Sequence, residues 1–368
     1  MITWHEELPL DTSHPITDQI FSEHAIFFDI ETTGFSPART SLYLIGCATR
    51  TGSILCLDQF FAETKSEESE VIHAFFSLLE KYDTILSFNG IGFDIPYLKA
   101  KCSTYHIADP FECHTYVDLY KEVSCIKRLL ALPNLKQKSI ETFLGIDRID
   151  EYSGGELIEI YKEYTKHPTK EALSLLRQHN YEDVLDMPKL LPILAYPKML
   201  NGAVTIDSLE ADEFTSYDGS LQKELIFSLA LDFPVPKPVS LRHEDFYLTA
   251  SHSSAKLSIR LFEGNLRHFF DSPKDYYYLP DEDRAVHKSI ATYVDRAHRV
   301  QANAKNCYTW KCAIFLPQFE KHIAPAFCTE VKDKKTYFEL SDEFITSESL
   351  QLTYVTHILL TLLKASKK

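Results

Sequence analysis

A short apolar segment, residues 25–28, leads directly into two acidic residues one position apart, Asp29 and Glu31. In a β-strand, residues i and i+2 project to the same side, so both carboxylates lie on one face at the carboxyl end of the strand. Two neighbouring carboxylates repel each other and are costly to desolvate unless a cation joins them. The pattern therefore predicts either a strand end exposed to solvent or a divalent metal site.

A third carboxylate, Asp94, stands at a predicted strand-to-helix junction. It follows the Asn89-Gly90 turn and comes two residues before Pro96, a residue favoured in the first turn of a helix. Two interpretations remain open: Asp94 caps the helix that follows, or it joins the acidic pair as a metal ligand. One residue can do both.

A histidine and a fourth carboxylate, His179 and Asp183, lie four residues apart in a segment with helical periodicity. At this spacing the two side chains share one face of the helix. A histidine one turn before an aspartate can act as a base beside a metal ligand, and it can equally form a local surface pair.

The order of predicted elements indicates an α/β fold with a mixed sheet flanked by helices. Apolar runs predict strands at residues 25–29, 43–49, 54–60, 84–88 and 115–118, helices at 67–81 and from near Pro96, and mostly helical structure over 119–190. The pattern changes near residues 188–202. Beyond them, the pattern predicts strands from alternation at 225–233 and from apolar runs at 246–250, 256–262 and 266–270. We expect a tight connection at 263–265 and helices at 281–300 and 350–364. We therefore expect a domain over residues 1–200 and a second, α+β domain of unrecognised topology over 201–368.

The three acidic motifs together resemble those of the DEDD-type 3′–5′ exonucleases, which have a ribonuclease H-like fold. Their motifs are D-x-E after a strand, N-x(3)-F-D, and a His or Tyr about one turn before an Asp. More narrowly, residues 23–198 resemble the bacterial YprB-type ribonuclease H-like domain. The matching text is Asp29 to Gly34, Tyr43 to Gly46, Phe93 to Lys99, Leu144 to Ile146, Gly155-Glu156 with Tyr161 and Tyr164, and His179 to Leu185.

This resemblance implies a role for each motif residue. Asp29, Glu31, Asp94 and Asp183 would bind two Mg²⁺ or Mn²⁺ ions, with Asp29 shared between them, and His179 would orient or deprotonate the attacking water. Thr32, Thr33 and Gly34 would approach the terminal nucleotide, and Asn89 would position the strand or brace its loop. One departure concerns His179: three residues separate it from Asp183, which is the spacing of the Tyr subtype, whereas the His subtype has four.

The composition limits the partners that we expect. Net charge is −15, and residues 1–200 hold 18 Lys and Arg against 30 Asp and Glu. Such a charge argues against tight, non-specific coating of DNA, because phosphate binding needs cations, but it permits a small site for a single-stranded 3′ end of DNA or RNA. The N-terminus does not read as a signal peptide, no 18-residue apolar run is present, and the eight Cys are scattered, so we expect a cytoplasmic protein with reduced thiols and no membrane partner.

Two other functions stay open at this point. A binding or adaptor protein could carry a weak or inactive ribonuclease H-like domain, although all four carboxylates are present. A nucleotide phosphohydrolase would need less positive charge than an enzyme acting on polymers. In residues 201–368, basic residues mixed with aromatics suit single-stranded nucleic acid, and a solvated helix face beside ordinary core aromatics is the competing interpretation. The residues concerned are Arg284, Lys288, Arg296, Arg299, Lys305 and Lys311, with Tyr276, Tyr277, Tyr278, Tyr308 and Trp310.

Overall fold

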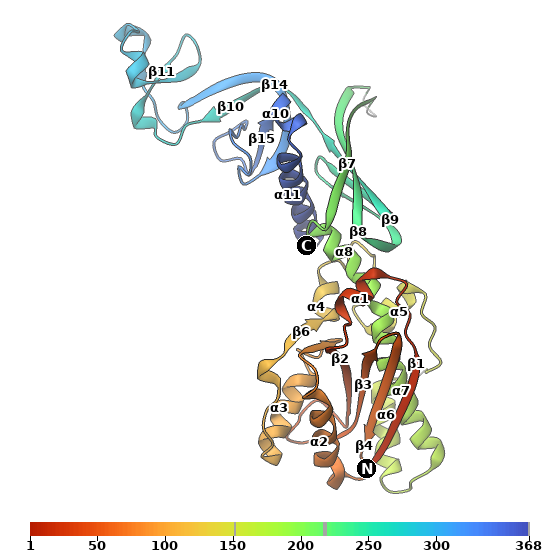
Figure 1. Cartoon of the computed structure of the whole chain (residues 1–368). Helices are drawn as coiled ribbons and strands as arrows, with labels where there is room; N and C mark the ends of the chain where they lie inside the picture. Colours follow the sequence, from red (N-terminus) through yellow and green to blue (C-terminus); the bar gives the residue numbers. More distant parts are fainter. Residues whose placement is uncertain (151, 216–218, 367–368) are drawn as a thin grey trace. The chain divides into compact units, whose positions relative to one another are not determined.

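The computed structural model describes residues 1–150, 152–215 and 219–366. The chain divides into two compact units (Figure 1). The first contains Met1–Lys198, Phe233–Lys237 and Ser366, and the second contains Met199–Asp232 and Pro238–Ala365. The main division thus falls at Lys198, inside the segment where the periodicity of the sequence changes. Among the described residues, no helix combines the length and the apolar character needed to cross a membrane.

A six-stranded mixed sheet of order β1-β4-β3-β2-β5-β6 forms the centre of the first unit. The first four strands in this order pair antiparallel, and β2, β5 and β6 pair parallel. The strands are β1 (Ile2–Pro9), β2 (Ala25–Thr32), β3 (Leu42–Thr51), β4 (Ile54–Phe61), β5 (Thr84–Ser87) and β6 (Thr115–Asp118).

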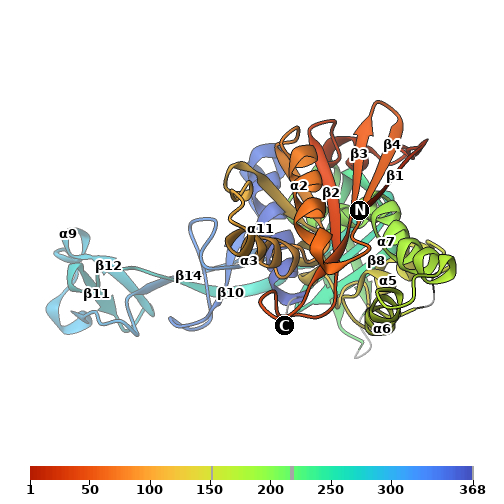
Figure 2. The same cartoon turned by 90° about the horizontal axis from the view of Figure 1, so that it is seen from below.

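Helices cover both faces of this sheet, as Figure 2 shows from below. Helices α2 and α3 pack on one face through a core that includes Phe28 and Phe75. Helices α6 and α7 pack on the other face, where Tyr43 stacks on Tyr161. The helices of this unit, with short 3₁₀ turns between some of them, are α1 (Pro15–Ile20), α2 (Glu68–Leu79), α3 (Asp94–Tyr105), α4 (Leu119–Ser124), α5 (Gln137–Leu144), α6 (Gly154–Tyr164), α7 (Lys170–Leu190) and α8 (Ala195–Leu200).

The predicted mixed sheet flanked by helices is confirmed, and so are its strands from β2 to β6 and helix α2. Strand β1 was not expected. It is an edge strand, and its charged residues obscure the alternation of apolar and polar positions. Trp4 lies under Arg177 of α7, with 5.1 Å between the guanidinium carbon and the ring centroid. Glu6 accepts a hydrogen bond from the hydroxyl of Tyr181 of α7. Side chains of α7 thus cover residues that the sequence alone presents as exposed.

The parallel pairing of β2 with β5 determines where the acidic motifs meet. Carboxyl ends of neighbouring parallel strands lie at the same edge of a sheet, and β2 ends at Thr32 while β5 ends at Ser87. The loop after β5 then leads into α3, which begins at Asp94. The topology therefore brings the first residue of α3 to the end of the strand that carries Asp29 and Glu31.

A buried ion pair supports the loop between β2 and β3. Glu68 of α2 and Lys101 of α3 lie 2.8 Å apart and are almost fully buried. Lys101 also donates to the carbonyl of Thr40, and Glu68 accepts from the backbone N–H of Leu42. Since buried charges are stable only when they are paired and hydrogen-bonded, this pair fixes α2, α3 and the start of β3 together.

The second unit contains three three-stranded sheets, of orders β7-β8-β9, β10-β14-β15 and β12-β11-β13. Strands β10 and β14 form a long ribbon that leads to the small sheet containing β11 and β12 (Figures 1 and 2). Helix α11 packs through Tyr354, whose ring contacts Phe338 of β15 and whose hydroxyl donates to the carbonyl of Pro317. The elements are β7 (Val204–Thr215), β8 (Leu221–His243), β9 (Phe246–Arg260), β10 (Phe262–Phe269), β11 (Tyr276–Leu279), β12 (Arg284–His287), α9 (Lys288–Ala291), β13 (Val300–Gln301), β14 (Tyr308–Phe319), β15 (Lys335–Glu339), α10 (Asp342–Thr346) and α11 (Glu348–Ser366).

Two expectations for this unit are wrong. Residues 281–300 do not form one helix, because β12 and β13 pair on either side of β11 and bury Ala285 and Ala302 beneath Tyr276 and Tyr278. Residues 263–265 are not a turn but part of β10, where each residue has a partner in β14. In both places strand pairing outweighs the local pattern. The closing helix, α11, is confirmed.

Candidate active site

Four carboxylates from three elements converge at the carboxyl end of β2. Asp29 and Glu31 project from β2 itself, Asp94 is the first residue of α3, and Asp183 lies on α7. Asp94 accepts a hydrogen bond from the backbone N–H of Ile30, with 3.3 Å between Oδ1 and nitrogen, and its side chain does not cap α3. The carboxylate of Asp94 therefore ties the helix to the strand between the two other acids.

Burial and mutual repulsion raise the pKa values of this cluster. Burial raises the pKa of Asp29 well above its usual range, and the charges of Asp183, Asp94 and Glu31 raise it further. Burial also raises the pKa of Glu31 to about 7, although the charge of His179 opposes the shift. The pKa of Asp94 rises to about 7, again chiefly through burial. Without a cation, this edge of the sheet is an unfavourable place for four negative charges.

An amide network holds Asp29 in place. Asp29, Gly46 and Gln59 face one another across β2, β3 and β4, and Asn180 of α7 lies over them. The Asn180 amide donates to Asp29 Oδ2 at 3.1 Å and accepts from Gln59 Nε2 at 3.0 Å. A Cβ atom at Gly46 would lie 2.1 Å from Asn180 Oδ1, so only glycine permits this approach.

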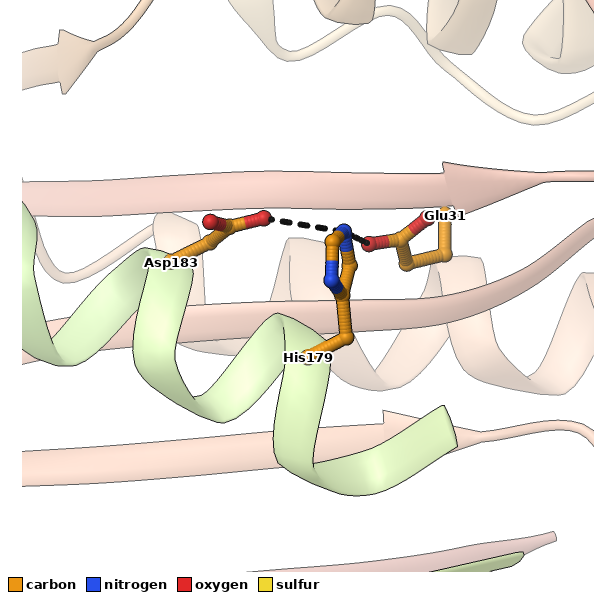
Figure 3. A group of neighbouring side chains, drawn as sticks. All are labelled: Glu31, His179 and Asp183. Atoms are coloured by element: carbon orange, nitrogen blue, oxygen red, sulfur yellow. Dashed lines mark ion pairs between the residues drawn. The ribbon is translucent and has the colours of Figure 1, made fainter. Parts of the chain in front are cut away.

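His179 is fixed at one ring nitrogen and faces the acids with the other. Nδ1 lies 2.6 Å from Asp150 Oδ2, while Nε2 lies 3.6 Å from Glu31 and 3.5 Å from Asp183 (Figure 3). Burial opposes ionisation of Asp150, but hydrogen bonds from His179 and Lys138 outweigh it, and the pKa of Asp150 is lowered. An ionised carboxylate only accepts hydrogen bonds, so it places a proton on Nδ1 and directs Nε2 toward the cluster.

Residues 148–150, in the loop before α6, form hydrogen bonds with one face of α7. Arg148 Nη1 donates to Asp183 Oδ1 at 2.6 Å and pairs with Glu141 of α5 at 3.1 Å. Glu182 accepts hydrogen bonds from the backbone N–H groups of Ile149 and Asp150. Three residues of one helix face, at positions 179, 182 and 183, thus each hold part of this loop.

The residues expected near a substrate end form a compact turn after β2. The Thr32 hydroxyl donates to the carbonyl of Gly34, and Thr33 Oγ1 accepts from the backbone N–H of Ser41. Gly34 has φ +151°, and a Cβ atom there would lie 2.9 Å from the Thr40 methyl. Next in the chain, Phe35 is 88% exposed and meets Phe93 edge-on with 5.9 Å between ring centroids. The turn therefore presents one large aromatic ring to solvent, four residues after Glu31 and in contact with the residue before Asp94.

Asn89 shapes the loop that leads to Asp94. It has φ +65°, and its backbone carbonyl accepts from the N–H groups of Gly92 and Phe93. Asp118 Oδ1 and Oδ2 accept from the N–H groups of Asn89 and Ile91. Asp118 therefore stabilises this loop, and its charge also helps to raise the pKa of Asp94. Whether the Asn89 side chain positions a strand or braces the loop stays a prediction.

The donors at this site fit a hard divalent cation. One ligand atom each from Glu31, His179 and Asp183 lie within 4.8 Å of one another, and the raised pKa values of Asp29, Glu31 and Asp94 indicate that their hydrogen bonds only partly offset burial and mutual repulsion. Carboxylate oxygens are the ligands that Mg²⁺ and Mn²⁺ prefer. The structure brings all five predicted residues to one place, the four carboxylates and His179.

Several site residues were not identified from the sequence. Asp150 and Arg148 come from a loop with no periodic pattern, and nothing local distinguishes them from other surface charges. Asn180 and Gly46 were quoted only as matching text, without a role. A signal existed for Gly46, because a glycine inside an apolar strand indicates a close approach by another group.

One comparison with known proteins identifies a family for most of the first unit. Residues 26–195 match the family model described as the RNase H superfamily, which confirms the predicted ribonuclease H-like domain. A search of curated proteins finds no match.

Similar solved structures are more distant. They include the family B DNA polymerase of the archaeon Pyrobaculum calidifontis (14% identity, 93% of this chain and 46% of the polymerase, TM-score 0.42), Brucella melitensis NrnC with bound Mg²⁺ (16%, 50% and 77%, 0.32), and E. coli exonuclease I in complex with a dT13 oligonucleotide (14%, 56% and 54%, 0.30). This chain spans about half the length of the polymerase and of exonuclease I.

We expect the metal-free protein to lose stability as pH rises. Unfolded carboxyls ionise near pH 4, whereas Glu31 and Asp94 have pKa values of about 7 in the folded state, so the folded state holds more protons between pH 4 and 7. The free energy of unfolding should therefore fall across that range, and Asp94→Asn should recover part of it at pH 8, with an upper limit of about 4 kcal/mol. Urea unfolding in EDTA at several pH values measures this. An unchanged or rising stability from pH 5 to 8 would contradict the crowding of charge described above.

Proposed function

We propose that residues 26–195, which form a domain of the ribonuclease H superfamily, hydrolyse phosphodiester bonds as a metal-dependent 3′–5′ exonuclease. The observation that carries the proposal is the meeting of Asp29, Glu31, Asp94 and Asp183 at one strand end, with His179 beside them. The direction of hydrolysis comes from the resemblance of the three motifs to DEDD-type exonucleases.

The four carboxylates would hold two divalent ions, Mg²⁺ or Mn²⁺. Such ions supply charge stabilisation for the phosphoryl oxygens and a nucleophile at neutral pH. The chain itself supplies the positioning: Asn180 and Gln59 fix Asp29, the Ile30 N–H fixes Asp94, and Arg148 fixes Asp183. Three of the four proposed ligands, Asp29, Asp94 and Asp183, are thus each held by a second group.

His179 would act on the attacking water through Nε2. Asp150 keeps a proton on Nδ1, so whenever the imidazole is neutral its lone pair is at Nε2, and that nitrogen lies within 3.6 Å of two ligand carboxylates. A base must lie within hydrogen-bond reach of the proton that it takes. The helical position of His179 explains its three-residue spacing, because residues i and i+4 of α7 face the same side.

The exposed ring of Phe35 favours a strand of nucleic acid over a free nucleotide as substrate. An aromatic ring that is 88% exposed beside a hydrolytic site offers a stacking surface for a base. A nucleotide phosphohydrolase, the alternative that needs less positive charge, binds a single base and gains less from an exposed ring outside the acidic cluster. An adaptor with an inactive domain, the other alternative, has no use for the network that holds Asp29, Asp94 and Asp183.

The carboxylates supply the first test. Asp29→Asn and Asp183→Asn should each lower Mn²⁺-dependent hydrolysis of a labelled oligonucleotide at least 100-fold, because each removes a charged ligand while keeping the side-chain shape. Asp186→Asn is the matched control. Asp186 lies three residues beyond Asp183 on the same helix, where it pairs with Lys189 instead. Full activity in Asp183→Asn, or equal losses in Asp183→Asn and Asp186→Asn, would contradict the proposed ligand set.

A second test separates base catalysis by His179 from simple packing. His179→Ala should lower turnover by roughly 10² at saturating Mn²⁺, and Asp150→Asn should lower it less, since the ring stays but its tautomer is no longer imposed. His179→Tyr should recover part of the loss, because the spacing suits a tyrosine. Metal affinity should stay within about threefold in all three variants. Turnover of His179→Ala within threefold of the parent chain would exclude His179 as the base.

A third test concerns Phe35 and the substrate class. Phe35→Ala should raise KM for a single-stranded oligonucleotide roughly tenfold, and Phe35→Tyr, which keeps a ring, should restore it. KM for bis-p-nitrophenyl phosphate, which has no adjacent base, should stay within about twofold. Equal changes in KM for both substrates would show that Phe35 stabilises the protein and does not bind the nucleic-acid strand.

A further inference from the structure

A polar network joins the β10–β14 ribbon of the second unit to the small sheet beside it. Tyr278 and Tyr308 both donate their hydroxyls to Asp283 Oδ1, the former at 2.6 Å. The guanidinium of Arg267 lies over the Tyr308 ring, 4.5 Å from its centroid. Because Asp283 fixes the phenol and the phenol supports the guanidinium, Arg267 is held in one orientation.

Beside this network lies a hollow of about 350 Å³. Arg267 of β10 and Trp310 of β14 are paired in register, so their side chains lie on the same face of the ribbon. Trp310 is 48% exposed, which leaves part of its indole open to the hollow and to solvent. The lining residues are Asn265, Arg267, Asp283, Trp310, Cys328 and Thr329.

The guanidinium N–H groups of Arg267 have no hydrogen-bond acceptor in the described part of the chain. Its backbone is secured on both sides, since its N–H donates to the carbonyl of Cys328 and its carbonyl accepts from the Cys328 N–H. Among residues 1–150, 152–215 and 219–366 its guanidinium contacts the Tyr308 ring but makes no hydrogen bond or ion pair, and Asp283 interacts with it through charge at longer range. By contrast, Arg284 pairs with Glu282, and Lys311 pairs with Glu339. A half-buried guanidinium with five free N–H donors suits an anion with several oxygens, such as phosphate.

We propose that this hollow binds one nucleotide unit of a single-stranded nucleic acid, with the phosphate on Arg267 and the base stacked on Trp310. A flat ring and a fixed guanidinium side by side match the two recurring parts of such a strand. An acidic protein segment would use the guanidinium but would leave the indole without a flat partner. The hollow lies outside the ribonuclease H domain, so the inference goes beyond the proposed hydrolytic site and does not depend on its activity.

Tryptophan fluorescence of the full-length chain tests the proposal directly. The chain has two tryptophans, Trp4 and Trp310, so Trp4→Phe leaves Trp310 as the only indole. In EDTA, where metal-dependent hydrolysis is absent, a dT12 or rU12 oligonucleotide should quench Trp310 with saturation. Adding Arg267→Ala should weaken this binding about tenfold. It should also lower the slope of log K against log[salt] by roughly the amount expected for one lost phosphate contact.

Arg242→Ala is the matched control, because Arg242 also lies over a tyrosine ring in this unit, 5.1 Å from the Tyr247 centroid, but does not line the hollow. This variant should bind within about twofold of the parent, and thermal melts should show that both variants fold. No quenching of Trp310, or equal weakening by Arg242→Ala, would overturn the proposal. Quenching by oligoglutamate with the affinity of the oligonucleotide would overturn the nucleic-acid assignment, and equal affinity for thymidine monophosphate would overturn the assignment to a strand.

Discussion

Repulsion among four closely placed carboxylates, one buried and three partly buried, is the constraint around which the first unit is organised. Asp29, Glu31, Asp94 and Asp183 meet at the carboxyl end of β2, where burial and mutual charge hold pKa values of Glu31 and Asp94 near 7. Such an arrangement is costly by itself. Its neighbours offset part of that cost with a backbone N–H at Asp94, an amide at Asp29 and a guanidinium at Asp183. A protein that only needed to fold would gain stability by replacing Asp29, Glu31 or Asp94, whose pKa values are raised by burial, and that is the physical reason for assigning the cluster a function.

The fold serves this cluster in two ways. Parallel pairing of β2 with β5 delivers Asp94 to the strand end, and packing of α7 across the sheet delivers His179, Asn180 and Asp183 from consecutive turns. The approach of α7 depends on Gly46, since a side chain there would collide with Asn180. Arg148 and Asp150, in the loop before α6, then hold Asp183 and His179 of α7 through hydrogen bonds. Backbone topology thus sets the positions of the ligands, and a surrounding layer of hydrogen bonds sets their orientations.

Much of this unit could be predicted from the sequence because its signals are local. An apolar strand ending in D-x-E, a turn before Asp94, and a His–Asp pair at helical spacing each depend on a few adjacent residues, and together they indicated the cluster. Asp150 and Arg148 could not be found in this way, because their importance arises from contacts 29 and 35 positions away along the chain. The same reason explains the missed edge strand β1 and the mistaken helix at 281–300, where pairing with distant strands decided the outcome. In the second unit, the sequence indicated a mixture of cations and aromatics, but only the strand register shows that Arg267 and Trp310 share a face.

The central claim is that the carboxylate cluster is a divalent metal site, and calorimetric titration of the metal-free chain with Mn²⁺ tests it most directly. At pH 8 we expect saturable binding that is lost in Asp29→Asn and kept in Asp186→Asn. At pH 6, where Glu31 and Asp94 are largely protonated, binding should weaken and release protons to the buffer. Mn²⁺ binding of equal strength in Asp29→Asn, or an absence of binding to the parent chain at pH 8, would contradict the account.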